Sequence, residues 1–137
     1  MSETSFQKIF FWGLLLVYPI IYAPFGINET DGGFITGLAW QISQGKQLYS
    51  SIIYVRPPMP VWIRAIELGV FPENYAILAE RILFYWKLGI SAWLAADILA
   101  NKRQKWLLAT LGFIVSVHSY PAAAWHTVDG ILFSVLS

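Results

Sequence analysis

Two acidic residues, Asp31 and Asp129, are the strongest candidates for chemistry in this chain. A pair of carboxylates can activate a hydroxyl group by general-base catalysis, or bind a divalent cation that neutralises a phosphate. Glu29, two positions before Asp31, would give it acidic support. Each aspartate alone also fits a structural role, because Asp is a preferred N-cap residue and is favoured in the first turn of a helix. Both interpretations stay open at this point.

Two basic residues, Arg56 and Lys87, stand at places where the surrounding sequence restricts the position of the positive charge. Arg56 precedes Pro57-Pro58, which favours extended backbone, so its guanidinium could clamp a phosphate through two hydrogen bonds. The alternative is an arginine that snorkels or binds lipid headgroups. Lys87 interrupts a long apolar run; it either serves a function there or pairs with an acid of a neighbouring helix.

Composition decides which class of protein must position these residues. The 137 residues are 57% hydrophobic, 17% aromatic and only 12% charged, against roughly 25% charged residues in average soluble domains. This composition predicts a membrane protein. With no Cys, disulfides, thiolate zinc sites and cysteine nucleophiles are excluded. Nine basic against eight acidic residues is too balanced for a nucleic-acid binder. His118 and His126 do not have metal-ligand spacing, and no metal site is predicted.

The hydropathy pattern predicts an all-α, integral membrane helical bundle that forms a single domain over residues 1–137. Three apolar runs predict membrane spans at about 9–27, 75–100 and 106–124. The first and third are uncharged, and the second has an apolar core over 82–96 that only Lys87 interrupts. A partial fourth span begins at Asp129, and the chain looks cut off within it. The polar segment 28–74 predicts an external loop with two amphipathic surface helices, one starting near Phe34 and one over 61–71.

Charge near the spans predicts the orientation. The turn 101–105 carries three cations, and the positive-inside rule places such a turn in the cytoplasm. The N-terminus is then also cytoplasmic, in a multi-pass protein of the cell membrane. The 28–74 loop lies outside, so Asp31, Arg56 and Asp129 all map to the outer face of the membrane.

Five short segments resemble the N-terminal part of polytopic GT-C glycosyltransferases, the relatives of protein O-mannosyltransferases and of the aminoarabinose transferase of lipid A. Each segment is weak alone, but their order and spacing follow the family pattern over essentially the whole chain. They are Thr30-Asp31-Gly32-Gly33-Phe34-Ile35, Gln44-Gly45-Lys46-Gln47-Leu48-Tyr49, Arg56-Pro57-Pro58-Met59-Pro60, Ala79-Glu80-Arg81-Ile82-Leu83 and Trp125-His126-Thr127-Val128-Asp129-Gly130-Ile131-Leu132-Phe133.

The resemblance implies transfer of a sugar from a polyprenyl-phosphate donor to an acceptor on the outer membrane face, by an inverting displacement. Asp31 matches the loop acid that is the candidate base, and Asp129 matches the second acid near the mouth of the bundle. Arg56 matches the basic residue that contacts the lipid phosphate. Gly32 stands where relatives with an Asp-Glu pair have Glu, so a two-acid loop motif does not carry over.

We therefore expect a membrane glycosyltransferase or the N-terminal fragment of one. Because relatives build the donor cavity from many more spans, the isolated chain is expected to be inactive. The alternative is a non-catalytic accessory subunit that packs against a membrane protein partner. A transporter fragment using Lys87 and Asp97 receives little support, because the two side chains point in different directions on one helix. Expected partners are the lipid donor and membrane lipids, and dependence on a divalent cation stays open.

Overall fold

The computed structural model describes residues 3–26, 31–120, 122 and 126–137, and within this part the chain is all-α. An isolated bridge between Leu48 and Ile52 is the only strand-like pairing in these residues. The elements, in order, are α1 (Glu3–Tyr22), α2 (Asp31–Ser43), α3 (Met59–Val70), the 3₁₀ turn η1 (Glu73–Tyr75), α4 (Ala76–Leu99), α5 (Lys105–Ser119) and α6 (His126–Leu136).

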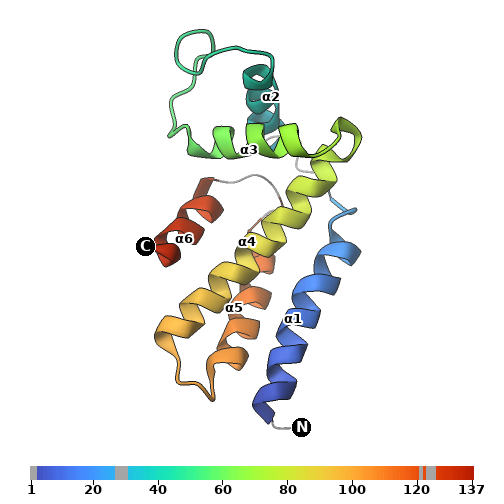
Figure 1. Ribbon diagram of the computed structural model, residues 1–137, viewed down its shortest axis with the longest axis vertical. Helices are drawn as coiled ribbons and strands as arrows, with labels where there is room; N and C mark the ends of the chain where they lie inside the picture. The colour runs from blue at the N-terminus through green and yellow to red at the C-terminus, as the bar shows by residue number, and fades with distance from the viewer. Residues whose placement is uncertain (1–2, 27–30, 121, 123–125) are drawn as a thin grey trace.

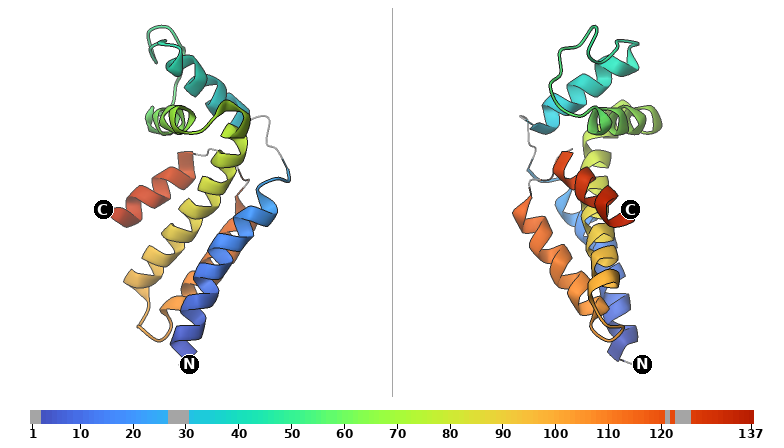
Figure 2. Two further views of the ribbon diagram at one scale, coloured as in Figure 1. Left: turned by 45° about the vertical axis from the view of Figure 1, so that its right-hand side comes forward. Right: turned by 90° about the vertical axis from the view of Figure 1, so that its left-hand side faces the viewer.

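The helices form two parts (Figure 1). Helices α1, α4 and α5 run side by side as a bundle, and α6 packs on α4. Helices α2 and α3 pack against each other across one end of this bundle, and we call residues 31–70 the α2–α3 unit. Both views of Figure 2 place the start of α1 and the α4–α5 turn at the opposite end. The structure thus separates the basic turn from the α2–α3 unit.

The two amphipathic helices of the 28–74 segment are confirmed. On α2, Ile35, Leu38 and Ala39 are buried against Val61 of α3, as the sequence periodicity predicts. Phe34, near which this helix was expected to start, lies one turn inside it and is about half exposed. Helix α3 begins directly after the proline pair and carries Pro60 in its first turn, where a missing N–H breaks no helical hydrogen bond.

The predicted spans agree with the helices to different degrees. Helix α4 matches the second predicted span within one residue at each end. The boundaries of the first span, 9–27, are wrong: α1 begins earlier because helical geometry continues through the polar residues before the apolar run, and it ends at Tyr22. The third span, 106–124, is also too long. Helix α5 ends at Ser119 because the proline at 121 disfavours a helical conformation of Tyr120, which is extended.

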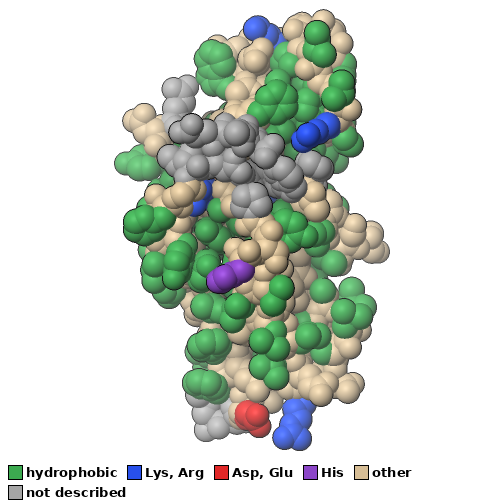
Figure 3. Space-filling model, turned by 180° about the vertical axis from the view of Figure 1, so that it is seen from behind, with side chains coloured by type: hydrophobic (Ala, Val, Ile, Leu, Met, Phe, Trp, Pro, Cys, Tyr) green, Lys and Arg blue, Asp and Glu red, His purple; other side chains and the backbone are tan. Residues whose placement is uncertain are grey.

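Two helices are long and apolar enough to cross a membrane, Glu3–Tyr22 and Ala76–Leu99, whereas Lys105–Ser119 and Thr127–Leu136 are shorter apolar helices. Much of the bundle surface is hydrophobic: Ile9, Leu16 and Ile20 of α1 and Val115 of α5 are more than half exposed. On the face seen in Figure 3, hydrophobic side chains cover the bundle, and acidic and basic groups show at its lower end.

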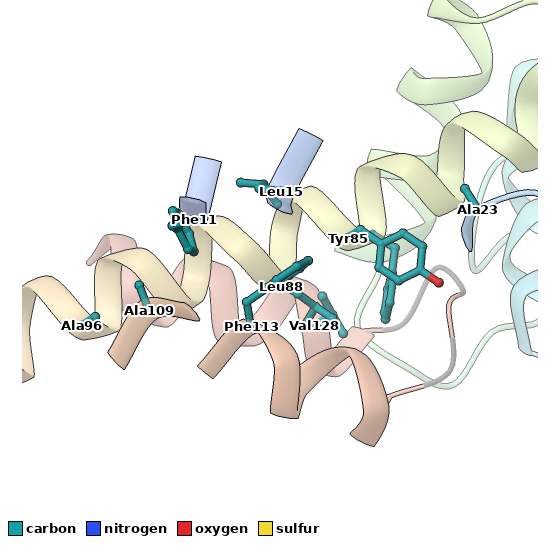
Figure 4. Close-up of a cluster of buried hydrophobic side chains, with 10 residues drawn as sticks. Phe11, Leu15, Ala23, Tyr85, Leu88, Ala96, Ala109, Phe113 and Val128 are labelled. Atoms are coloured by element: carbon teal, nitrogen blue, oxygen red, sulfur yellow. The ribbon is translucent and has the colours of Figure 1, made fainter. Parts of the chain in front are cut away.

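The bundle core joins four helices (Figure 4). Leu88 of α4 lies among Phe11 and Leu15 of α1, Phe113 of α5 and Val128 of α6, all buried. The contact between α1 and α4 depends on Gly89. A Cβ atom built at this glycine would lie 2.3 Å from a methyl carbon of Leu15, far inside van der Waals contact.

We expect the Gly89→Ala variant to loosen the packing of α1 on α4. The added methyl group must displace the buried Leu15, and overpacking of this kind costs roughly 1–3 kcal/mol. Thermal unfolding in detergent, followed by circular dichroism, should show a lower midpoint. Gly13→Ala is the matched control, since a Cβ there meets nothing within 4 Å and alanine is the better helix former. Equal midpoints for Gly89→Ala and the parent chain would contradict the packing argument.

Candidate functional site

Five charged residues form a continuous ion-pair network where the α2–α3 unit meets the bundle. They come from three helices that are separate in sequence. The members are Arg64 and Glu67 of α3, Glu80 and Lys87 of α4, and Asp129 of α6.

Arg64 is the centre of the network at the α2–α3 unit. Its side chain is only 1% exposed, and its guanidinium contacts Glu67 at 3.1 Å and Glu80 at 2.9 Å. It also donates hydrogen bonds to Thr36 Oγ1 of α2 and to the backbone carbonyl of Ala76. Thr36 in turn donates to Glu80 Oε2 at 3.0 Å. One arginine therefore joins α2, α3 and α4, in the fork geometry that only a guanidinium offers.

Lys87 extends the network from α4 to α6. Its ammonium lies 2.8 Å from Asp129 Oδ1 and 3.3 Å from Glu67 Oε1. The interpretation of Lys87 as the partner of an acid on a neighbouring helix is thus confirmed, and it has two such partners. Because a buried charge is tolerated only when it is paired, this lysine fixes both α3 and α6 to α4.

The structure places the predicted acidic residues as follows. Asp129 lies in the first turn of α6, 4% exposed, with its carboxylate on Lys87. Asp31 is the first residue of α2, so its backbone lies at the start of the α2–α3 unit. The Asp31 side chain, and Glu29 altogether, lie outside the described residues. The predicted approach of Asp31 to Asp129 therefore stays a prediction.

Arg56 lies in the loop between α2 and α3 and lines a hollow of about 270 Å³ together with Phe34, Ile53, Tyr54 and Val55. We call this the Arg56 hollow. The hydroxyl group of Tyr49, a residue in the left-handed region at φ 71°, donates a hydrogen bond to the Arg56 carbonyl at 2.7 Å and holds this loop in place. Phe34 is in the first turn of α2, one turn after Asp31, so the hollow opens beside the start of that helix.

Tyr54, one of the residues that line the Arg56 hollow, has an unused hydrogen-bonding group. Tyr54 is 5% exposed, and its buried hydroxyl group has no hydrogen-bond partner in the part of the chain that the structure describes. Burial raises the pKa of this hydroxyl, although the Arg56 guanidinium partly opposes the shift. The hydroxyl therefore stays protonated at neutral pH and is available as a donor. An arginine and a tyrosine with an unpaired hydroxyl group, both among the residues that line one hollow, suit an anionic ligand.

Sequence reasoning missed most of the buried charges. Arg64 and Glu67 interrupt the short apolar run of α3, and their spacing of three places them on one face of this helix, toward α4. Opposite charges at this spacing on a helix that is otherwise apolar are the signal that could have found them. In the same way, Glu80 and Arg81 stand near the start of an apolar helix, where unpaired charges would be costly.

No group of three or more potential metal ligands of the His, Cys, Asp or Glu type occurs within the described ranges. Comparison with known proteins adds no family: the chain matches no family model, no curated protein and no solved structure.

Proposed function

We propose that this chain forms the donor-phosphate side of a membrane glycosyltransferase that uses a polyprenyl-phosphate sugar on the extracytoplasmic face. The observation that carries the proposal is the Arg56 hollow, in which a guanidinium and an unpartnered buried hydroxyl lie beside the start of α2, where Asp31 stands. The order of elements supports it: an apolar helix, two amphipathic helices across one end of the bundle, and a long apolar helix that returns.

The proposed reaction divides the work between Asp31 and Arg56. Asp31 accepts the proton of the acceptor hydroxyl as that oxygen attacks the anomeric carbon of the sugar. The bond from the anomeric carbon to the phosphate oxygen breaks, and the lipid phosphate leaves with the electron pair. Arg56 and the Tyr54 hydroxyl bind the phosphate oxygens and stabilise the charge that develops on them. Attack from the face opposite the leaving group inverts the anomeric centre.

In this proposal Asp129 acts with Lys87. The ion pair places the start of α6 against the end of the bundle that carries the α2–α3 unit, and so limits how far the two can separate. Asp129 thereby forms part of the wall of the site, with its carboxylate held in an ion pair with Lys87. A role for a divalent cation is compatible with either aspartate.

We further propose that the bundle crosses the cell membrane with the α4–α5 turn and the N-terminus in the cytoplasm. The turn is basic, and two lysines at this end of the bundle lie beside tryptophans, as at many membrane interfaces. Lys105 pairs with Asp97 and stands 4.9 Å from the Trp93 ring and 5.3 Å from that of Trp106. Lys8 stands 5.8 Å from the Trp106 ring. These groups support placing this end at the cytoplasmic headgroup level.

A transfer assay tests the function. The purified 137-residue chain, and a version extended with any coding sequence that follows it, are incubated with labelled polyprenyl-phosphate sugars and acceptor lipids or peptides. Transfer by the extended form would support the glycosyltransferase proposal. The absence of transfer in both forms, together with a stable complex with another membrane protein, would favour the accessory-subunit alternative.

The accessory-subunit alternative has one observation of its own. A hollow of about 310 Å³ between α4, α5 and α6 is walled mainly by small and apolar residues such as Ala92 and Gly112. Ser91 lines it and is 5% exposed, with a hydroxyl group that has no hydrogen-bond partner among the described residues. A partner helix with a small or polar residue would fit such a surface.

Binding of the lipid phosphate can be measured without transfer. We expect Arg56→Gln to weaken the binding of polyprenyl phosphate to the purified chain by about 10- to 100-fold, because a hydrogen bond to a charged group is worth roughly 1.5–3 kcal/mol. Tyr54→Phe should weaken binding by a smaller factor, because it removes only a neutral donor. Arg103→Gln, in the exposed turn at the opposite end, is the control. Equal affinities for Arg56→Gln and Arg103→Gln would contradict the phosphate site.

A further inference from the structure

Arg81 of α4 binds the backbone of two segments that are far apart in the sequence. Its guanidinium donates hydrogen bonds to the carbonyl groups of Ala23, at 2.5 Å, and of Phe25 and Gly26, all in the segment that follows α1. It also donates to the carbonyl of Ala122, at 3.2 Å, in the segment that follows α5. Four carbonyl groups from two connections thus meet on one side chain.

The type of partner distinguishes this arginine from Arg64. Arg81 is 5% exposed, and no carboxylate lies within ion-pair distance of it among residues 3–26, 31–120, 122 and 126–137. Its charge is solvated by carbonyl dipoles instead. A guanidinium has five N–H donors in a fixed plane, whereas an ammonium offers a single charged centre, so lysine cannot reproduce this set of contacts.

The two segments that Arg81 binds lead to the two acidic residues of the proposed site. Gly26, which has φ 71° in the left-handed region, comes five positions before Asp31. Ala122 comes seven positions before Asp129. A side chain that fixes both connections at one point of α4 also limits where α2 and α6 begin.

We infer that Arg81 is a positioning residue that holds the entry to α2 and the entry to α6 at a fixed separation. This inference rests on the proposed function for its catalytic consequence, but its structural content does not. Arg81 itself touches neither donor nor acceptor. It acts through the carbonyl groups of residues 23, 25, 26 and 122, and thereby sets the relative placement of Asp31 and Asp129.

The test exploits the absence of cysteine in this chain. Phe25→Cys and Ala122→Cys place thiols on two residues whose carbonyls bind the same guanidinium. In the membrane-inserted full chain, a short bismaleimide should join them efficiently. We expect Arg81→Gln to slow this cross-linking by about tenfold or more. Each lost charge-assisted hydrogen bond shifts the equilibrium between the held and the separated positions of the two segments by at least this factor.

A second cysteine pair reports whether the bundle is intact. Ala92→Cys and Gly112→Cys lie on α4 and α5, where a Cβ built at Gly112 is 3.4 Å from the Ala92 Cβ, a separation close to that of a disulfide. This disulfide should form equally well with and without Arg81. Unchanged cross-linking of the 25/122 pair in Arg81→Gln would overturn the inference.

If Arg81→Gln abolishes the control disulfide, the variant does not fold and Arg81→Lys takes its place. Lysine keeps the positive charge but lacks the planar set of N–H donors of a guanidinium. Cross-linking of the 25/122 pair should therefore still be lost, while the control disulfide forms. Retained cross-linking of the 25/122 pair in Arg81→Lys would overturn the inference. In an active enzyme form, Arg81→Lys should lower kcat and leave the affinity for polyprenyl phosphate unchanged, because the Arg56 hollow is a separate site. Loss of lipid affinity would contradict this assignment, and the cross-linking result stands even if the protein transfers no sugar.

Discussion

Replacement of Arg64 by methionine is expected to separate the α2–α3 unit from the bundle and to lower the free energy of unfolding by roughly 3–5 kcal/mol. The loss is large because the guanidinium is buried and binds two glutamates from two helices. Without it, Glu67 keeps Lys87, but Glu80 loses its buried cationic partner. Limited proteolysis of residues 44–58 and thermal unfolding in detergent measure the effect.

Two further variants sharpen this experiment. Arg64→Lys keeps the positive charge but cannot reach both glutamates with separate N–H groups, so an intermediate loss is expected. Arg103→Met removes an arginine of the exposed turn and should change stability by less than about 0.5 kcal/mol. An Arg64→Met chain with the same midpoint and the same protease sensitivity as Arg103→Met would show that the network contributes nothing to the attachment of the α2–α3 unit.

The Asp31→Asn variant of an active form is expected to lose transfer activity by about 10²- to 10⁴-fold, the contribution typical of a general base. The substitution keeps the size of the side chain and removes its ability to accept a proton at neutral pH. Membrane insertion and helix content should stay unchanged, because a carboxylate at the first residue of α2 contributes only about 0.3–1 kcal/mol to that helix through the helix dipole. The measurement is the initial rate of transfer at saturating lipid donor.

Asp97→Asn is the matched control for this substitution. Asp97 lies near the other end of α4, paired with Lys105, and belongs to no part of the proposed site. Its replacement should leave the rate within about twofold, the typical scale of a surface substitution. If Asp31→Asn retained transfer at the rate of Asp97→Asn, Asp31 would not be the base, and its place in the first turn of α2 would be explained by the helix dipole alone.

Hydrophobic periodicity predicted the elements of this fold well, and local sequence signals explain why. Ile35, Leu38 and Ala39 recur at helical spacing and are buried on α3. Helix α2 could therefore be predicted from its own sequence, without knowing that it packs on α3. Helix α4 was placed almost to the residue because its apolar run is long and free of proline. The ends of α1 and α5 were misplaced because the boundaries of an uncharged run were used as helix boundaries. Such a run shows only which residues are apolar, whereas the backbone conformation decides where a helix ends.

The network around Arg64 and Lys87 could not be predicted in full, because its members meet only in three dimensions. The pairing of Lys87 with some acid could be anticipated, since a charge in an apolar helix needs a partner. The identity of that partner could not, because Glu67 lies before α4 and Asp129 lies two helices later. The carbonyl contacts of Arg81 could not be predicted for a different reason. Every residue has a backbone carbonyl group, so the residue types do not show which carbonyls accept a hydrogen bond from this arginine.

The double pairing of Lys87 has a consequence for biogenesis. Ribosomes at about 5–20 residues per second need roughly 2–8 s to make the forty or so residues between Lys87 and Asp129. During that interval the proposed membrane helix α4 already carries its lysine, and Glu67, which emerges first, is the acid that can neutralise it. In the proposed membrane orientation, Glu67 would be the first counter-ion of Lys87, and Asp129 would complete the pairing once it is made. Substitution of Glu67 should accordingly impair membrane insertion during synthesis more than substitution of Asp129 does.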